Sequence, residues 1–222
     1  TPRGKPITRP ELKKAEIGIN GLVFKSDNIK KTYKNLLNNS LSDNLPRNFS
    51  RPVKLNGIER EAVFDTVSIR DNIFKAGRIY FCHHLTPNLV WMPEYSSHKN
   101  NVFEIAEITV IDNNPLSVLK KINKITDKTI IDQKENFITV RTDDVKISLY
   151  DINSFKERYN NFGEEIKFRT EMFGSLILKT SSLSFLRKIK QVNFPNILKF
   201  EHENKIQILS KDYKFILEFI KS

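Results

Sequence analysis

The sequence predicts an α+β fold made of repeated βαβββ units that pack in pairs, with curled, mostly antiparallel sheets and helices on the outside. Three stretches of similar pattern, residues 21–37, 106–123 and 174–191, carry this prediction. Each begins with a short apolar run, meets a polar pair able to cap a helix, and ends with apolar residues at helical spacing. One curled unit alone would leave a sheet face uncovered, so we expect the units to pack in pairs.

The start of each predicted helix is marked by a polar pair. The pairs are Asp27 with Asn28, Asn113 with Asn114, and Ser181 with Ser182. Their side-chain oxygens can accept hydrogen bonds from the free N–H groups of the first turn. Pro115 suits the first turn of the second helix, because the N–H group that it lacks would have had no partner there. The three repeats therefore each predict a strand, a tight turn and an amphipathic helix.

The segments after each helix predict strands. They are residues 59–69 and 77–85 after the first helix, 135–143 and 145–152 after the second, and 197–203, 204–210 and 214–220 after the third. Turn residues separate them, among them Asn56 with Gly57 and Asp143 with Asp144. We expect one more strand in a unit where only two are visible, which completes the βαβββ pattern.

The repeats divide the chain into two regions. Residues 1–99 form the first, whose leading unit we expect to be incomplete, by truncation, disorder or real loss, because no strand pattern flanks residues 1–7. Residues 100–222 hold two units and are expected to form a complete pair on their own.

Composition narrows the classes of function. The net charge is +11, yet the lysines are dispersed over three helical patterns, so we expect no nucleic-acid partner. Apolar runs stay well short of the ~20 residues that span a bilayer, and no secretion leader is visible. A single cysteine, Cys82, fits a reducing compartment. These features predict a cytoplasmic protein without membrane contact. Glycine-rich phosphate loops and a G-x-S-x-G elbow are absent from the sequence.

One run stands out from the rest of the chain. Residues 80–100 hold three of the four histidines, the only cysteine and the only tryptophan. Within it, His84, Thr86 with Pro87, Trp91, His98 and Asn100 form the pattern H-x-T-P, then a tryptophan, then H-x-N. This pattern resembles that of the glyoxalase-like domain proteins of the vicinal oxygen chelate superfamily, in which it precedes the next βα unit.

The resemblance implies a divalent metal (Mg, Mn, Fe or Zn) held in the cup of paired units by side chains on first and last strands, usually His and Glu. Those positions fall on Glu107 and Glu218 here, and no first strand holds a histidine. Strict alternation places Glu218 on the face of Ile216 and Ile220, opposite Leu217 and its neighbours. Two carboxylates alone make a weak transition-metal site, although they can hold Mg²⁺ or Mn²⁺ if more oxygen ligands join them.

His84, Trp91 and His98 are the candidate ligand-binding residues. Adjacent strand residues point to opposite faces, so only one of His83 and His84 can face the cup. The resemblance favours His84, whose alternative role is a hydrogen bond to the following turn. Trp91 either walls a pocket for an apolar molecule or packs a connecting segment. His98 has an alternative role as a loop contact beside Asn100.

Two classes of function stay open. The first is a glyoxalase-like protein that binds a small organic molecule in the cup, as a metal-dependent lyase, isomerase or dioxygenase. The second is a non-catalytic protein that binds or sequesters a small molecule and lacks a complete metal site. Whether the protein is an enzyme is therefore left open. A homodimer is compatible with either class.

Overall fold

The computed structural model describes residues 16–126, 130–134, 136–142, 145–190 and 193–222. These residues form two compact units. The first contains residues 16 and 21–96, and the second contains residues 17–20 and 97–222. The predicted remnant of a leading unit, residues 1–7, lies outside the described residues.

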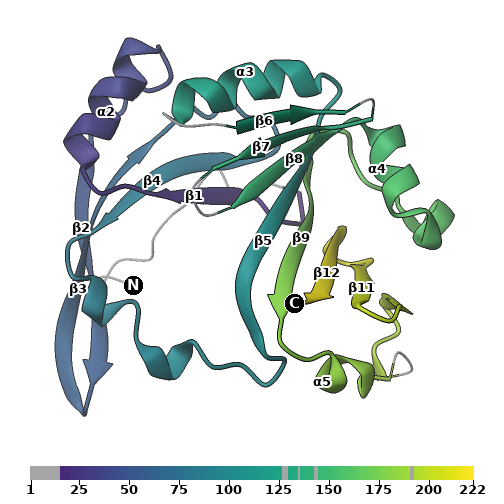
Figure 1. Cartoon of the computed structure of the whole chain (residues 1–222). Coiled ribbons are helices and arrows are strands. Elements are labelled where there is room, and N and C mark those ends of the chain that lie inside the picture. The colour runs from purple at the N-terminus through teal and green to yellow at the C-terminus, as the bar shows by residue number, and fades with distance from the viewer. Residues whose placement is uncertain (1–15, 127–129, 135, 143–144, 191–192) are drawn as a thin grey trace. The chain divides into compact units, whose positions relative to one another are not determined.

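The first unit contains one βαβββ module (Figure 1). Its elements are β1 (Gly21–Lys25), α2 (Ile29–Asn38), β2 (Arg47–Leu55), β3 (Ile58–Ser68) and β4 (Arg78–His84), followed by the 3₁₀ turns η1 (Pro87–Leu89) and η2 (Pro93–Tyr95). The strand order is β1-β4-β3-β2, with β1 parallel to β4 and the other pairs antiparallel. Asn28 caps α2 by accepting from the Lys31 amide at 3.0 Å, as the sequence predicts.

The second unit contains two such modules in one eight-stranded sheet. The first module is β5 (Val102–Ile111), α3 (Pro115–Ile125), β6 (Ile130–Gln133), β7 (Ile138–Arg141) and β8 (Lys146–Tyr150). The second is β9 (Met172–Thr180), α5 (Ser184–Arg187), β10 (Ile197–Glu201), β11 (Lys205–Ser210) and β12 (Phe215–Lys221). The segment that joins them contains α4 (Ile152–Arg158) and η3 (Asn160–Glu165). The predicted α+β fold of paired βαβββ units is confirmed.

The two modules join through their first strands. The strand order is β10-β11-β12-β9-β5-β8-β7-β6, so the antiparallel pair β5–β9 lies at the centre. Each first strand also runs parallel to the last strand of its own module, β5 to β8 and β9 to β12. This topology brings residues more than 100 positions apart into one continuous sheet.

The two faces of this sheet are covered differently. On one face Leu183 and Leu186 of the α5 region pack on Ile206 and Phe219, and α3 packs on β7 and β8 (Figure 1). On the other face lies the joining segment α4–η3. Its buried Phe155, Tyr159 and Phe162 contact residues of several strands, including Ile111, Tyr150 and Ile216. The joining segment therefore fills part of the cup that the paired modules form.

Gly174 in β9 allows the joining segment to approach closely. A Cβ atom at this position would lie 2.8 Å from Cδ1 of Ile111 and 2.8 Å from Cε2 of Phe155. Contacts that short do not occur between real side chains, so any larger residue would displace Phe155 or the strand. Phe155 is completely buried, which makes it the anchor of α4 on the sheet.

The third predicted helix is shorter than expected. The pattern over residues 174–191 predicts several turns, whereas α5 covers only Ser184–Arg187. The residue before the helix, Leu183, offers no capping side chain, although the Ser182 hydroxyl accepts from the Ser184 amide at 3.2 Å. The Lys199 ammonium donates to the carbonyls of Leu186 and Ile189 where the helix ends. Within the described residues no helix has the length and apolar character needed to cross a membrane.

Candidate functional site

A row of side chains crosses the cup face of the second unit. Register places Gln207 opposite Glu218, Glu218 opposite Ile177, Ile177 opposite Glu107, Glu107 opposite Lys146, and Lys146 opposite Arg141. Residues directly opposite each other project from the same face. Apart from Ile177, the residues of this row are polar, and they come from five strands. They lie on the face of the sheet that also carries Ile216, as alternation along β12 predicts for Glu218.

Glu107 lies at the centre of this row and is almost completely buried. Its side chain is 5% exposed, and both of its oxygens are occupied by cations. The Lys146 ammonium lies 2.6 Å from Oε2, and Nη1 of Arg158 donates to Oε1 at 2.8 Å. Burial would raise the pKa of Glu107, but the Arg158 charge and the hydrogen bonds from Arg158, Lys146 and Ser148 hold it below its ordinary value.

Arg158 reaches this row from the end of α4. Helix α4 begins at Asp151, whose carboxylate accepts hydrogen bonds from the Asn153 and Ser154 amides. The helix ends at Arg158. Nη1 of Arg158 also donates to the Tyr150 hydroxyl, and its Nη2 lies 3.9 Å from Oε1 of Glu218. Burial alone would lower the pKa of Arg158, whereas Tyr159 and Glu107 raise it above its ordinary value. The guanidinium therefore stays charged between two carboxylates.

Glu218 has a second partner on its other side. Its Oε2 accepts a hydrogen bond from Nε2 of the Gln207 side chain, and Nδ2 of Asn161 in η3 donates to Oε1 of Gln207 at 3.3 Å. The Glu218 side chain is 9% exposed. A buried carboxylate is costly unless it is paired, and here Arg158 and Gln207 supply the partners.

A second polar row lies two residues deeper in the cup. The hydroxyls of Thr109 and Ser175 are 2.7 Å apart, and the Tyr159 hydroxyl lies 2.9 Å from that of Ser175. All three residues are buried. Burial raises the pKa of Tyr159, so its phenol is neutral at physiological pH. These hydroxyls satisfy one another, and they lock the joining segment to the central strands β5 and β9.

The carboxylates at the positions that the resemblance implies for metal ligands do not fit a metal ion. Glu107 and Glu218 both lie opposite Ile177, so their backbones are two strand spacings apart, about 10 Å. Binding a divalent ion between them would require displacing Arg158, which lies between the two at 2.8 Å from Glu107 and 3.9 Å from Glu218. Among the described residues, no group of three or more His, Cys, Asp or Glu side chains is placed to hold a metal.

The depressed pKa of Glu107 makes a prediction about pH. A carboxyl group whose pKa is lower in the folded state than its ordinary 4.5 stabilises the fold above that value. This contribution is lost as pH falls through the folded pKa. We therefore expect the stability difference between the wild type and Glu107→Gln to be largest near pH 7 and to shrink steadily below about pH 4.5. Urea unfolding followed by circular dichroism at several pH values measures it, and a difference that stays constant with pH would contradict it.

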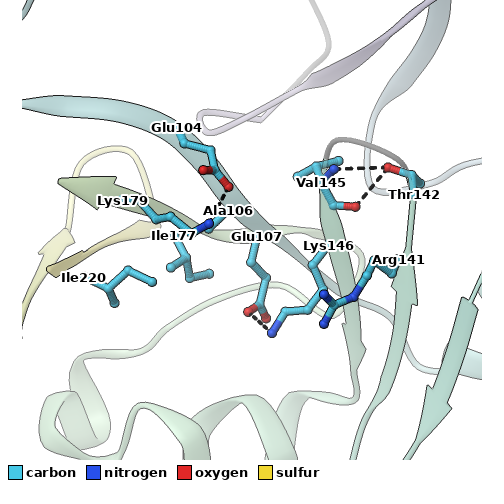
Figure 2. Close-up of a pocket in the computed structure, with 10 residues that line it drawn as sticks. All are labelled: Glu104, Ala106, Glu107, Arg141, Thr142, Val145, Lys146, Ile177, Lys179 and Ile220. Atoms are coloured by element: carbon cyan, nitrogen blue, oxygen red, sulfur yellow. Dashed lines mark hydrogen bonds and ion pairs between the residues drawn. The ribbon is translucent and has the colours of Figure 1, made fainter. Parts of the chain in front are cut away.

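A pocket of about 360 Å³ opens beside Glu107 (Figure 2). Its lining residues are Glu104, Ala106, Glu107, Arg141, Thr142, Val145, Lys146, Ile177, Lys179 and Ile220. In Figure 2 the side chains of Arg141, Lys146 and Glu107 point to the same side of the sheet. The Lys179 ammonium pairs with Glu104 at 2.7 Å. The pocket therefore combines charged side chains with a small apolar wall.

The predicted ligand-binding residues fall in different units. In the first unit, Nδ1 of His84 accepts a hydrogen bond from Nε1 of Trp91 at 3.0 Å, and the His84 ring meets Phe64 edge to face. Burial, together with Lys25 and His83, lowers the pKa of His84, which fits a neutral acceptor. Trp91 is 65% exposed. The exposed His98 belongs to the second unit.

Comparison with known proteins supports the fold. No family model and no curated protein matches the chain. Among solved structures, a hypothetical protein from Staphylococcus aureus matches at 11% identity over 96% of this chain and 69% of that chain, with a TM-score of 0.65. A xylose isomerase-like TIM barrel/4-hydroxyphenylpyruvate dioxygenase fusion protein matches at 10% identity over 92% of this chain and 38% of that chain, with a TM-score of 0.51.

The chain shares its α+β fold of paired βαβββ units with these two structures. Identities this low establish the fold alone, and a fold of this kind supports many activities. The chemistry must therefore be argued from the side chains.

Three cations of the cup were missed by the sequence analysis. They are Arg141, Lys146 and Arg158. A signal for Arg158 exists, because Asp151 can cap a helix whose apolar positions, Ile152, Phe155 and Tyr159, recur at helical spacing. For Lys146 and Arg141 only the register across β5, β8 and β7 reveals their place beside Glu107.

Proposed function

We propose that this chain is a small-molecule-binding protein whose second unit holds the ligand in the pocket beside Glu107, and that it does so without a catalytic metal. The observation that carries the proposal is the position of Arg158, which occupies the space between Glu107 and Glu218. Both carboxylates pair with the Arg158 guanidinium. The remaining open volume lies toward Arg141, Lys146 and Lys179, and it is of the size that small-molecule sites have.

The pocket suits binding better than turnover. Within the described residues its lining offers no histidine, cysteine or serine, so it lacks a thiol, a serine hydroxyl and an imidazole base. The one hydroxyl among those residues, that of Thr142, donates to the Val145 carbonyl at 2.9 Å. Its one buried acid, Glu107, has a lowered pKa and two cationic partners. Such a carboxylate is a weak base, and its role is to hold Lys146 and Arg158 in place.

Two sets of measurements on the purified protein test this function, one on ligand binding and one on the effect of metal ions. Isothermal titration calorimetry against a library of small organic molecules should find ligands, and methyl NMR should show shifts at Ala106, Val145 and Ile177 when they bind. After treatment with a chelator, thermal unfolding should be unchanged by Mg²⁺, Mn²⁺, Fe²⁺ or Zn²⁺, and ligand affinity should be unchanged as well.

The rival interpretation is a metal-dependent enzyme. It would be supported if one of these ions raised the unfolding temperature of the wild type and if Glu107→Gln removed that increase. A library that produces no shifts at the three pocket methyl groups would overturn the proposed function itself.

A further inference from the structure

The pocket carries an unusual pair of like charges. Arg141 on β7 lies directly opposite Lys146 on the antiparallel strand β8. Like charges at directly opposite positions destabilise a strand pair, so this arrangement needs compensation. For Lys146 the compensation is Glu107, at 2.6 Å.

Arg141 is not compensated in this way. Within the part of the chain that the structure describes, no ion pair or side-chain hydrogen bond involves Arg141, which is exposed. The other cations around the pocket are occupied, Lys179 by Glu104 and Arg158 by Glu107 and Glu218. Among the described residues, the Arg141 guanidinium therefore has no partner for its N–H groups, and it lines the pocket beside a second cation.

A count of charges limits the ligand. The cations are Arg141, Lys146, Arg158 and Lys179, and the anions are Glu104, Glu107 and Glu218. These described side chains leave a surplus of one positive charge. A ligand with one negative charge would neutralise the pocket, whereas a phosphate monoester, with nearly two charges at neutral pH, would leave an excess.

The rest of the lining defines the body of the ligand. Ala106, Val145, Ile177 and Ile220 contribute an apolar wall next to the cations. A volume of about 360 Å³ is at the small end of the range for ligand sites. The body must therefore be compact and mainly apolar.

We propose that the ligand is a small monocarboxylic acid whose carboxylate is held by Arg141, with Lys146 beside it, and whose apolar body packs on Ile177 and Ile220. This inference rests on the proposed function, since it assigns a ligand class to the same pocket. The arginine fork matches the two oxygens of a carboxylate, and such charge-assisted bonds are stronger than neutral ones.

Matched ligand pairs test the charge. Benzoate, phenylacetate and hexanoate are each compared with the corresponding primary amide by isothermal titration calorimetry at low ionic strength. We expect each acid to bind about ten- to hundredfold more tightly than its amide, because the amide cannot form the charge-assisted bonds. Added salt should weaken the acids and leave the amides nearly unchanged.

Three variants test the site. Arg141→Gln should weaken binding of the acids by about tenfold or more, and Arg141→Lys should fall between this variant and the wild type, since it keeps the charge but loses the fork. The matched control is Lys120→Gln, which removes one exposed positive charge from α3 and should leave the affinity unchanged. Circular dichroism checks that all three variants fold.

Each result has a distinct meaning. Acids and amides that bind equally well would overturn the carboxylate assignment and leave the binding function standing. Acids that bind as tightly to Arg141→Gln as to Lys120→Gln would overturn the role of Arg141. If no acid or amide perturbs the pocket methyl groups while other library members do, the ligand class is wrong. If nothing in the library does, the proposed function fails as well.

Discussion

Replacing Arg158 with methionine should destabilise the second unit by about 3–5 kcal/mol at pH 7. Methionine fills much of the same volume but carries no charge, so the buried Glu107 and Glu218 lose the cation between them. An uncompensated carboxylate in a buried position is expensive, and the cost of breaking such a pair exceeds what the pair contributes when intact. Hydrogen exchange of peptides from β5 and β9 measures the loss where it occurs.

The same variant should respond to pH in a characteristic way. Without Arg158, Glu107 loses the charge and one of the hydrogen bonds that hold its pKa below its ordinary value, so lowering the pH removes less stability from the variant than from the wild type. The deficit relative to the wild type should therefore be smaller at pH 4.5 than at pH 7. A merely steric defect would leave the deficit the same at both pH values.

A control variant separates burial from charge. Lys179→Met breaks the pair with Glu104, in which both side chains are at least a third exposed, and it should cost less than about 1 kcal/mol. The only tryptophan, Trp91, belongs to the first unit, so its fluorescence monitors that unit in the same samples. Equal losses in Arg158→Met and Lys179→Met would contradict the central role of Arg158.

Phe155→Ala should cost about 3–5 kcal/mol and release α4 from the sheet. The Phe155 ring is fully buried and packs against Tyr150 and Tyr159, at centroid distances of 6.2 and 4.9 Å. Losing this anchor should increase hydrogen exchange over residues 152–165 more than in α3. Phe185→Ala on α5, where the ring is 40% exposed, is the matched control and should cost much less.

Gly174 allows a sharper test of the same contact. Gly174→Ala alone should destabilise by about 1–3 kcal/mol, because its methyl group would meet the Phe155 ring at 2.8 Å. In the Phe155→Ala background the two contacts with the ring are gone and only the contact with Cδ1 of Ile111, the flexible end of a side chain, remains, so the second substitution should cost less. A double-mutant cycle measures the coupling, and purely additive losses would show that the two residues do not share this contact.

Much of the fold follows from local signals in the sequence. Asn28 and Asn114 cap their helices as predicted, each accepting from an amide three residues later at 3.0 Å. Period-two alternation places Ile216 in the cup and Leu217 on the opposite face, so Glu218 was assigned to the right side of its strand. These features depend on neighbours within a few residues, which a single sequence contains.

The candidate site depends on long-range pairing and was predicted only in part. Glu107 and Glu218 were identified from the resemblance, but the cation that joins them comes from a helix 51 residues beyond Glu107. Nothing in the spacing of the three residues along the chain indicates their contact. The expectation of a metal followed from the positions of the acids, whereas the outcome depends on Arg158, which only the path of the joining segment brings there.

The positive charge between Glu107 and Glu218 comes from Arg158, a residue of the chain itself. A protein that relies on a metal must acquire it from its surroundings, and it competes for that metal with every other chelator present. Here the cation is synthesised with the chain and enters the cup when α4 packs through Phe155. Every folded copy therefore carries one Arg158 guanidinium between Glu107 and Glu218, in a fixed ratio to the chain.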